Sequence, residues 1–183
     1  MHSPLIKNII QRWRVRAGFL GIILVILLSK PNWISILSGF ALCLLGLLIR
    51  TWAAGHLKKE KELTVSGPYR YTRNPLYLGN VIVGISVVIG SYSWWALTIF
   101  VVYVLLFYPS AVKREKYRMK ELFPEKYEKY SEKVPLFFPT LKPKYPAEEK
   151  IFDFGLYKKN KEYRALVGAF FFWIILVEKS IFF

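Results

Sequence analysis

Arginine, tyrosine and asparagine side chains are concentrated in the segment Ser66–Gly79 of this 183-residue chain. Asn74 precedes Pro75 and is therefore disfavoured in a helix, whereas Pro75 fits the first turn of one. The free backbone N–H groups at that helix start, with Arg73 beside them, would bind an anion. An alternative is that these residues only anchor a helix end in lipid headgroups. Flat faces on which an aromatic ring or a sulfonium group could rest come from Tyr69, Tyr71 and Tyr77.

A second patterned segment, Lys113–Pro139, follows a long apolar stretch. Its first acid, Glu115, is either a surface carboxylate paired with neighbouring cations or a ligand for a cationic group at the membrane edge. Pro109 lies six residues earlier and predicts a kink that opens space beside the helix. Chemistry at either segment therefore depends on helices that bring both segments to one membrane face.

Five apolar blocks must position these segments, and they predict an all-α, polytopic membrane bundle of about five spans. All but two of the 27 Lys and Arg residues lie before the first block, between 50 and 73, or between 113 and 164. Positive residues favour the cytoplasmic face, so the N-terminus and both patterned segments are expected in the cytosol. The blocks are Ala17–Leu28, Ile34–Ile49, Leu76–Gly90, Trp94–Val112 and Ala165–Val177.

The rest of the sequence narrows the classes of function. We interpret residues 1–183 as one membrane domain, with an extended connector at 139–149 and an additional apolar helix at 163–180 that either spans or lies in the interface. The net charge of +15 favours anionic lipid headgroups over nucleic acid. The sequence lacks Rossmann and P-loop glycine motifs and Cys/His clusters. Small size and missing sorting signals favour a bacterial or archaeal plasma membrane, and the oligomeric state stays open.

The two patterned segments together resemble the integral-membrane methyltransferases related to isoprenylcysteine carboxyl methyltransferase and the phospholipid N-methyltransferases. In that family a G-x-Y-x-x-x-R-[HN]-P-x-Y segment leads into a membrane helix, and here it corresponds to Gly67–Tyr77. After the next helix come an acidic pair and then F-x-x-x-Y-x-x-Y-x-x-x-V-P-x-x-x-P. Glu115 and the segment Phe123–Pro139 match that second pattern. The resemblance covers residues 50–139.

The resemblance implies S-adenosylmethionine as the cofactor and a lipid or lipidated acceptor, either a carboxylate such as prenylcysteine or an amine headgroup. It implies that Glu115 takes the amino group of the cofactor, and that Arg73 orients a carboxylate or holds the loop. Lys113 or Arg114 would contact the acceptor, because the family arginine with that role aligns with Ala111. The other implied cofactor contacts are Lys61, Leu63, Thr64, Tyr69, Asn74, Pro75, Leu76 and Tyr77.

Two further departures from the family pattern keep other functions open. The family histidine is Asn74 here, and the second acid of the pair is Lys116. One alternative is a membrane reductase that binds NADPH at a similar Arg-His/Asn-Tyr segment. The other is a non-catalytic membrane adaptor. Cofactor binding separates the methyltransferase from the reductase, and turnover separates it from the adaptor.

Overall fold

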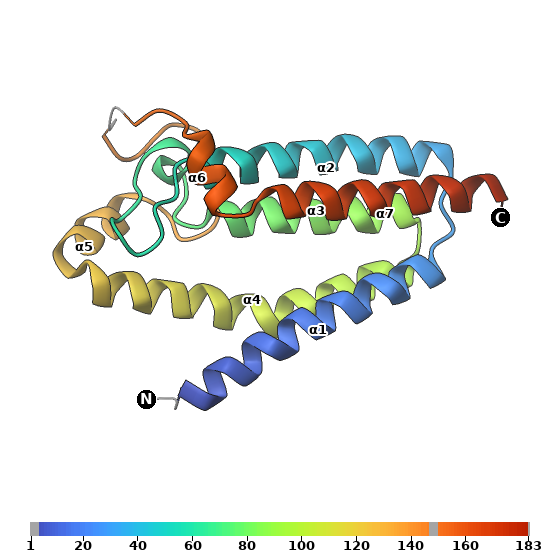
Figure 1. Cartoon of the computed structure of the whole chain (residues 1–183), viewed down its shortest axis with the longest axis horizontal. Coiled ribbons are helices and arrows are strands. Elements are labelled where there is room, and N and C mark those ends of the chain that lie inside the picture. Colours follow the sequence, from blue (N-terminus) through green and yellow to red (C-terminus); the bar gives the residue numbers. More distant parts are fainter. Residues whose placement is uncertain (1–3, 147–149, 183) are drawn as a thin grey trace.

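All regular secondary structure is helical in the part of the chain that the computed structural model describes, residues 4–146 and 150–182. The predicted helical membrane bundle is therefore confirmed. Long helices lie side by side, and the loops and short helices gather at one end (Figure 1). The elements are α1 (Pro4–Leu28), α2 (Trp33–Ala54), the 3₁₀ helix η1 (Gly67–Arg70), α3 (Pro75–Ser91), α4 (Trp94–Leu122), α5 (Pro124–Lys133), α6 (Phe154–Lys159) and α7 (Tyr163–Phe182).

Three of these helices, α2, α4 and α7, are long and apolar enough to cross a membrane. Helix α3 is apolar but has only 17 residues, and α1 has 25. Each predicted apolar block lies within one of the five long helices. The fifth block becomes a 20-residue helix, which meets the length that a span requires.

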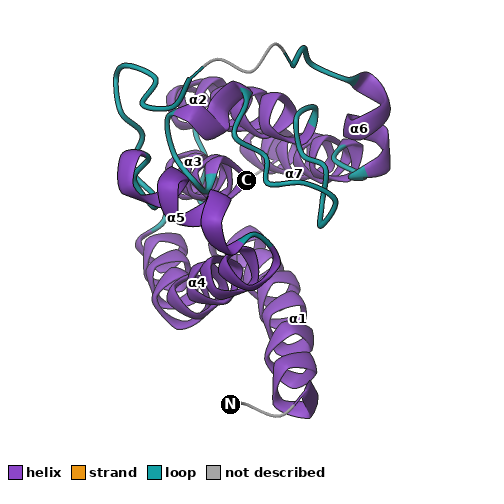
Figure 2. Cartoon of the chain, turned by 90° about the vertical axis from the view of Figure 1, so that its left-hand side faces the viewer, coloured by secondary structure: helices purple, strands orange, loops and turns teal. Residues whose placement is uncertain are grey.

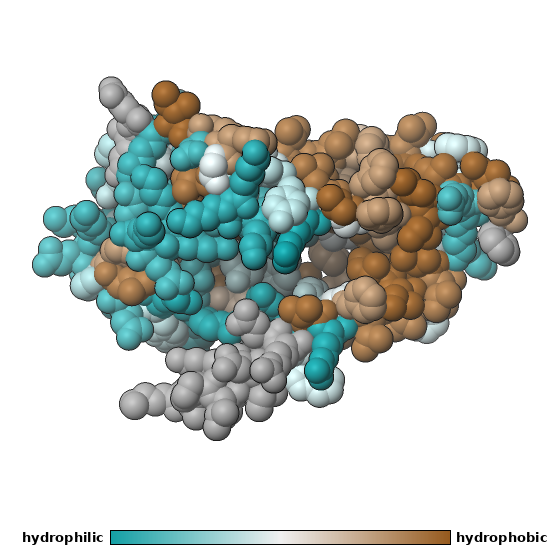
Figure 3. All heavy atoms as spheres, viewed as in Figure 1, coloured by the Kyte–Doolittle hydropathy of each residue, from teal (hydrophilic) through white to brown (hydrophobic). Residues whose placement is uncertain are grey.

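The outer surface of the bundle has the polarity expected of a membrane protein. Hydrophobic residues cover most of the length of the helices, and hydrophilic residues cover the loop end (Figure 3). Large apolar side chains such as Phe19, Leu105 and Phe170 are more than 60% exposed. So extensive an apolar surface is unfavourable in water and favourable in lipid. The candidate spans and this apolar surface together make the chain an integral membrane protein.

Helices α2 and α3 form the closest pair in the bundle. A Cβ atom added to Gly46 would lie 3.0 Å from the carbonyl oxygen of Gly79, and one added to Gly79 would lie 2.9 Å from that of Gly46. The two backbones thus meet where neither carries a side chain, as small residues allow in membrane helix pairs. This contact fixes Arg50, one turn after Gly46, beside Asn80, the residue after Gly79.

Two polar side chains, each forming two hydrogen bonds, connect the C-terminal helices to the rest of the bundle. Asn160 donates through Nδ2 to the carbonyl oxygens of Ala54 and Leu57, both at 2.9 Å, where α2 ends. At the opposite end, Lys179 donates to the carbonyl oxygens of Ile26 and Leu27 in the last turn of α1. Carbonyls at a helix end lack partners within the helix, so these side chains complete both helices.

The loop-bearing end of the bundle is more helical than the apolar blocks indicated. Helix α4 continues through Pro109 and runs ten residues beyond the fourth block, and Pro124 starts the separate helix α5. Lys, Arg and Glu favour helix, so the helix extends into water once the apolar stretch ends. The connector 139–149 is irregular as far as 146, and its last three residues lie outside the described part. It is held by the backbone N–H of Lys144, which donates to the Arg70 carbonyl.

Candidate active site

Three hydrogen bonds join the two patterned segments side by side, although the segments are far apart in the sequence. Three consecutive residues of the first segment donate to three consecutive carbonyl oxygens of the second. The Asn74 side chain supplies an N–H donor here, so this family position retains a polar contact without histidine. The bonds are Thr72 Oγ1 to Phe137 O at 2.8 Å, Arg73 N to Pro135 O at 2.9 Å and Asn74 Nδ2 to Leu136 O at 2.9 Å.

Two buried tyrosines on α5 strengthen the same junction. Tyr127 and Tyr130 are three residues apart, so they lie on one face of the helix. The Tyr130 hydroxyl donates to the carbonyl oxygen of Tyr69 at 2.6 Å. Arg73 Nη1 donates to the Tyr127 hydroxyl at 3.1 Å, and its guanidinium carbon lies 5.8 Å from the centre of that ring. The spacing of the second motif therefore has a structural explanation: it fastens α5 onto the first motif.

A cavity of about 1110 Å³ lies beside this junction and extends between α1, α3 and α4. It collects ten of the twelve site residues that the resemblance implied. The other two are Lys61, which is exposed outside the lining, and Lys113, which borders a smaller pocket next to Leu136. The ten that line the cavity are Leu63, Thr64, Tyr69, Arg73, Asn74, Pro75, Leu76, Tyr77, Arg114 and Glu115.

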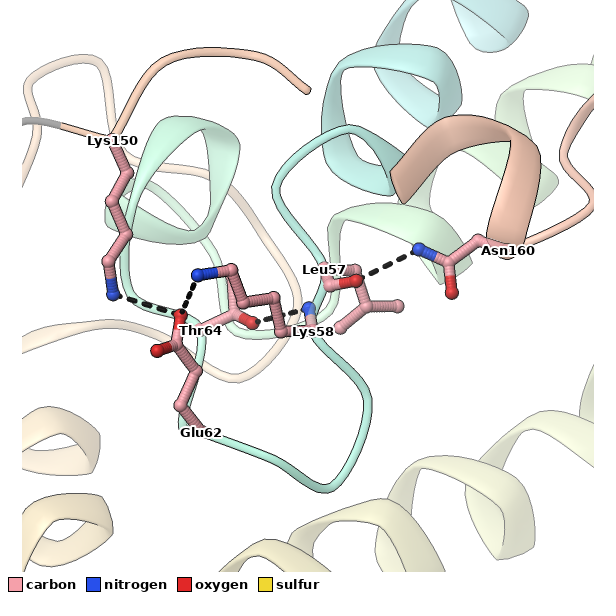
Figure 4. Close-up of polar contacts among 6 residues, drawn as sticks. All are labelled: Leu57, Lys58, Glu62, Thr64, Lys150 and Asn160. Atoms are coloured by element: carbon pink, nitrogen blue, oxygen red, sulfur yellow. Dashed lines mark hydrogen bonds and ion pairs between the residues drawn. The ribbon is translucent and has the colours of Figure 1, made fainter. Parts of the chain in front are cut away.

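The loop between α2 and η1 forms one wall of the cavity and is held by polar contacts (Figure 4). The Thr64 hydroxyl accepts from the backbone N–H of Lys58 at 3.3 Å. Glu62 forms ion pairs with Lys58 at 3.3 Å and with Lys150 at 2.9 Å. The hydrogen bond from Lys150 lowers the pKa of the Glu62 carboxyl group, and Lys58 adds to this effect. Lysines 58 and 59, rather than Lys61, line the cavity at this wall.

Two groups in the cavity wall remain available to a ligand. Glu115 is exposed at the cavity and forms no ion pair with any residue in the described part of the chain. Arg73 Nε is buried and has no hydrogen-bond partner among the described residues. A buried N–H without a partner is costly, which makes this nitrogen a ready donor to an oxygen of a ligand. The wall thus offers both an acid and a cationic donor.

The tyrosine hydroxyls at the junction stay protonated. Burial raises the pKa of Tyr69, and the nearby acidic groups of Tyr130, Glu115 and Glu162, which are negative when ionised, raise it further. Burial also raises the pKa of Tyr130, against the opposing effect of Arg73. These groups therefore act as hydrogen-bond donors and not as bases near neutral pH.

Among the polar residues of the cavity wall that were not identified from the sequence, three form one cluster: Arg50, Asn80 and Glu162. Arg50 lies near the end of α2, and its Nε donates to the Glu162 carboxylate at 2.5 Å. Its Nη1 contacts the Asn80 side-chain oxygen on α3. The sequence offers one signal of this cluster, an arginine near the end of an otherwise apolar helix, and the charge of that arginine alone indicates only membrane topology.

Comparison with known proteins finds two relatives whose names refer to resistance to metals. The nickel-cobalt-cadmium resistance protein NccN of Alcaligenes xylosoxydans xylosoxydans is 28% identical over 181 residues, which is 93% of this chain and 76% of that protein. The cobalt-zinc-cadmium resistance protein CzcN of Cupriavidus metallidurans is 32% identical over 96 residues, or 50% of this chain and 43% of that protein. No solved structure matches the chain.

The family profile described as phospholipid methyltransferase matches residues 17–126. This range is more than half of the chain, and it holds the first motif, Glu115 and most of the cavity wall. Its match ends before Tyr127, so the junction tyrosines and the C-terminal helices lie beyond it. On this match, the chain belongs to the phospholipid methyltransferase family.

Proposed function

We propose that this protein transfers a methyl group from S-adenosylmethionine to a lipid-like acceptor at the cytosolic face of the membrane. The observation that carries the proposal is the convergence of ten family-implied residues on one cavity. The hydrophilic, loop-bearing end of the bundle holds that part of the cavity (Figure 3). The excess of Lys and Arg in its segments supports a cytosolic location.

The free groups of the cavity wall fit the cofactor. Glu115 would hold its ammonium group, and the unpartnered Nε of Arg73 would donate to its carboxylate. Tyr77, which meets the ring of Tyr108 edge to face at 5.6 Å, presents an aromatic face for a cation. When bound, S-adenosylmethionine supplies a methyl group activated by the sulfonium charge. The residues of this chain would position both reactants and exclude water.

The chemistry of the site suits an acceptor that is already deprotonated. The raised pKa values of Tyr69 and Tyr130 remove both as general bases. A carboxylate acceptor needs no base, whereas an amine acceptor would have to arrive deprotonated or use Glu115. Apolar helices around the cavity would accommodate the hydrocarbon part of the acceptor.

Isothermal titration calorimetry on the detergent-purified chain tests the proposal. We expect micromolar binding of S-adenosylmethionine, weakened about tenfold or more by Glu115→Ala and by Tyr77→Ala, because each removes a direct cofactor contact. Glu125→Ala serves as the control, since Glu125 is an exposed acid on α5 outside the cavity lining. Binding of NADPH in place of S-adenosylmethionine would refute the proposal in favour of a reductase, and binding without turnover on any lipid acceptor would favour an adaptor.

The names of two relatives connect those proteins with resistance to metals. In the described part of this chain, no group of three or more His, Cys, Asp or Glu side chains could hold a metal ion. We propose that any contribution of this chain to metal resistance comes through methylation of a membrane component. Growth of a strain lacking the protein on cadmium or cobalt, complemented by the wild type or by Glu115→Ala, tests this: equal rescue by both would contradict it.

A further inference from the structure

The polar cluster of Arg50, Asn80 and Glu162 lies in the cavity wall but takes no part in the cofactor contacts described above. Its members come from α2, from α3 and from the turn just before α7. Arg50 and Glu162 have side chains only 15% and 9% exposed. Burying an ion pair costs much of the energy that the pair returns, so a buried pair is a poor device for stability alone. A role in binding explains its position better.

The contacts of Arg50 leave one face of its guanidinium group available. Glu162 accepts from Nε, and Asn80 accepts from Nη1. No hydrogen bond of Nη2 is formed with any described residue, and the group lines the cavity. A guanidinium held at two of its nitrogens is oriented in advance, so it would lose little entropy when an oxygen anion binds the third. Phosphate and carboxylate groups have the matching geometry.

The charge of the cavity selects the sign of the ligand. Ten basic and four acidic side chains line it, and Glu162 is already paired with Arg50. A cationic headgroup would meet this excess of positive charge, whereas an acidic headgroup would be attracted by it.

The position of the cluster suits the headgroup of an amphiphile. Asn80 lies six residues beyond Asn74 on α3, which places it about 9 Å further from the motif junction at the helical rise. Beyond the cluster, the lining becomes apolar and small, with Gly18 and Gly21 from α1 and Gly84 from α3. On the face shown in Figure 3, the surface is hollowed between α7 and α1. A hydrocarbon chain can therefore pass from the cluster toward lipid.

From these observations we infer that Arg50, positioned by Glu162 and Asn80, binds the acidic headgroup of the lipid acceptor, whose hydrocarbon tail leaves between α1 and α7. This inference rests on the proposed function in treating the bound lipid as a methyl acceptor. The binding itself does not require the cofactor. The inference also gives α7 a function. Glu162 lies in the turn just before α7, and both lie outside the matched family range.

The test uses the full chain in nanodiscs of phosphatidylcholine without S-adenosylmethionine. The probes are a stearic acid carrying a nitroxide near its chain end and a chain-matched nitroxide stearylamine, at about pH 9, where the acid is ionised and the amine still protonated. Electron paramagnetic resonance measures the immobilised fraction of each probe. We expect saturable immobilisation of the acid and none of the amine.

The double variant Arg50→Gln/Glu162→Gln removes both charges without leaving one buried alone, and should weaken binding of the acid at least tenfold. Arg50→Lys keeps the ion pair with Glu162 but loses the forked N–H donors of the guanidinium group, so it should weaken binding of the acid several-fold. This variant serves as the test if the double variant does not fold. Lys159→Gln, which removes one positive charge at an exposed position of α6 outside the cavity lining, should have no effect. Equal immobilisation of the amine, or unchanged binding in the Arg50 variants, overturns the inference. If millimolar inorganic phosphate displaces the acid, the site binds a free anion, and the inference that it binds a lipid headgroup is overturned. Calorimetry with S-adenosylmethionine on the same samples reports separately on the proposed function.

Discussion

Replacing Tyr130 by Phe tests whether the second motif acts by fastening α5 to the first motif. The change removes one hydroxyl, whose bond to the Tyr69 carbonyl is 2.6 Å long and buried. Loss of a donor to a buried carbonyl costs about 1–3 kcal/mol, because that oxygen has also lost its water. At about 2–4 °C per kcal/mol for a chain of this size, the melting temperature should fall by roughly 2–12 °C. Differential scanning fluorimetry in detergent measures this shift.

The matched control is Tyr117→Phe, because Tyr117 lies on the part of α4 beyond the fourth apolar block and is 60% exposed. Its loss should change the melting temperature by less than about 1 °C, since exposed hydroxyls contribute little. Tyr130→Phe should also weaken S-adenosylmethionine binding, because Tyr69 and Arg73 of the cavity wall are held through this junction. If Tyr130→Phe and Tyr117→Phe behave alike in both assays, the fastening role is refuted.

Three other predictions follow from the same contacts. Burial raises the pKa of Tyr69, so the folded state keeps a proton that the unfolded state releases above about pH 10. The stability of the fold should therefore decrease as pH rises past that value, and it should decrease less in Tyr69→Phe. The melting temperature measured against pH tests this. Lys150 lowers the pKa of Glu62, so the stabilisation that the Glu62 carboxylate gives is present above its ordinary pKa of 4.5 and is lost as pH falls below that value. Protease cleavage of the 57–64 loop should therefore increase at low pH. The Glu62→Gln variant should show the same increase at neutral pH. Gly46→Leu should destabilise the chain by about 1–3 kcal/mol or more, because its side chain would strike the backbone of Gly79; a melting temperature equal to that of the wild type would contradict the close packing of α2 and α3.

The sequence was sufficient to predict the helical membrane bundle. Long apolar blocks have few possible structures in lipid, so each of them lies within a helix as expected. Residues 66–79 and 113–139 were linked by a family pattern, and the structure brings them together through Thr72, Arg73 and Asn74. The cofactor contacts of these residues remain predictions.

What the sequence could not supply is pairing over long distances. Arg50 and Glu162 are 112 residues apart, and nothing in the residues near either one indicates the other. Lys179 likewise completes the last turn of α1 across more than 150 residues of sequence. The extent of α4 beyond the fourth block was missed for a different reason. Hydropathy marks where a helix leaves the membrane, but helix propensity decides where it ends.

The C-terminal segment contacts the rest of the chain at four points, three of which lie near the cavity. Lys150 holds the loop that carries Thr64, and Asn160 completes the end of α2. Glu162 orients Arg50, and Lys179 completes α1 on the opposite side of the bundle. An additional helix that only anchored the protein in lipid would need none of these contacts. Because three of the four lie at the end of α2 that carries the candidate site, we propose that this segment forms the wall that adapts the methyltransferase core to its own acceptor.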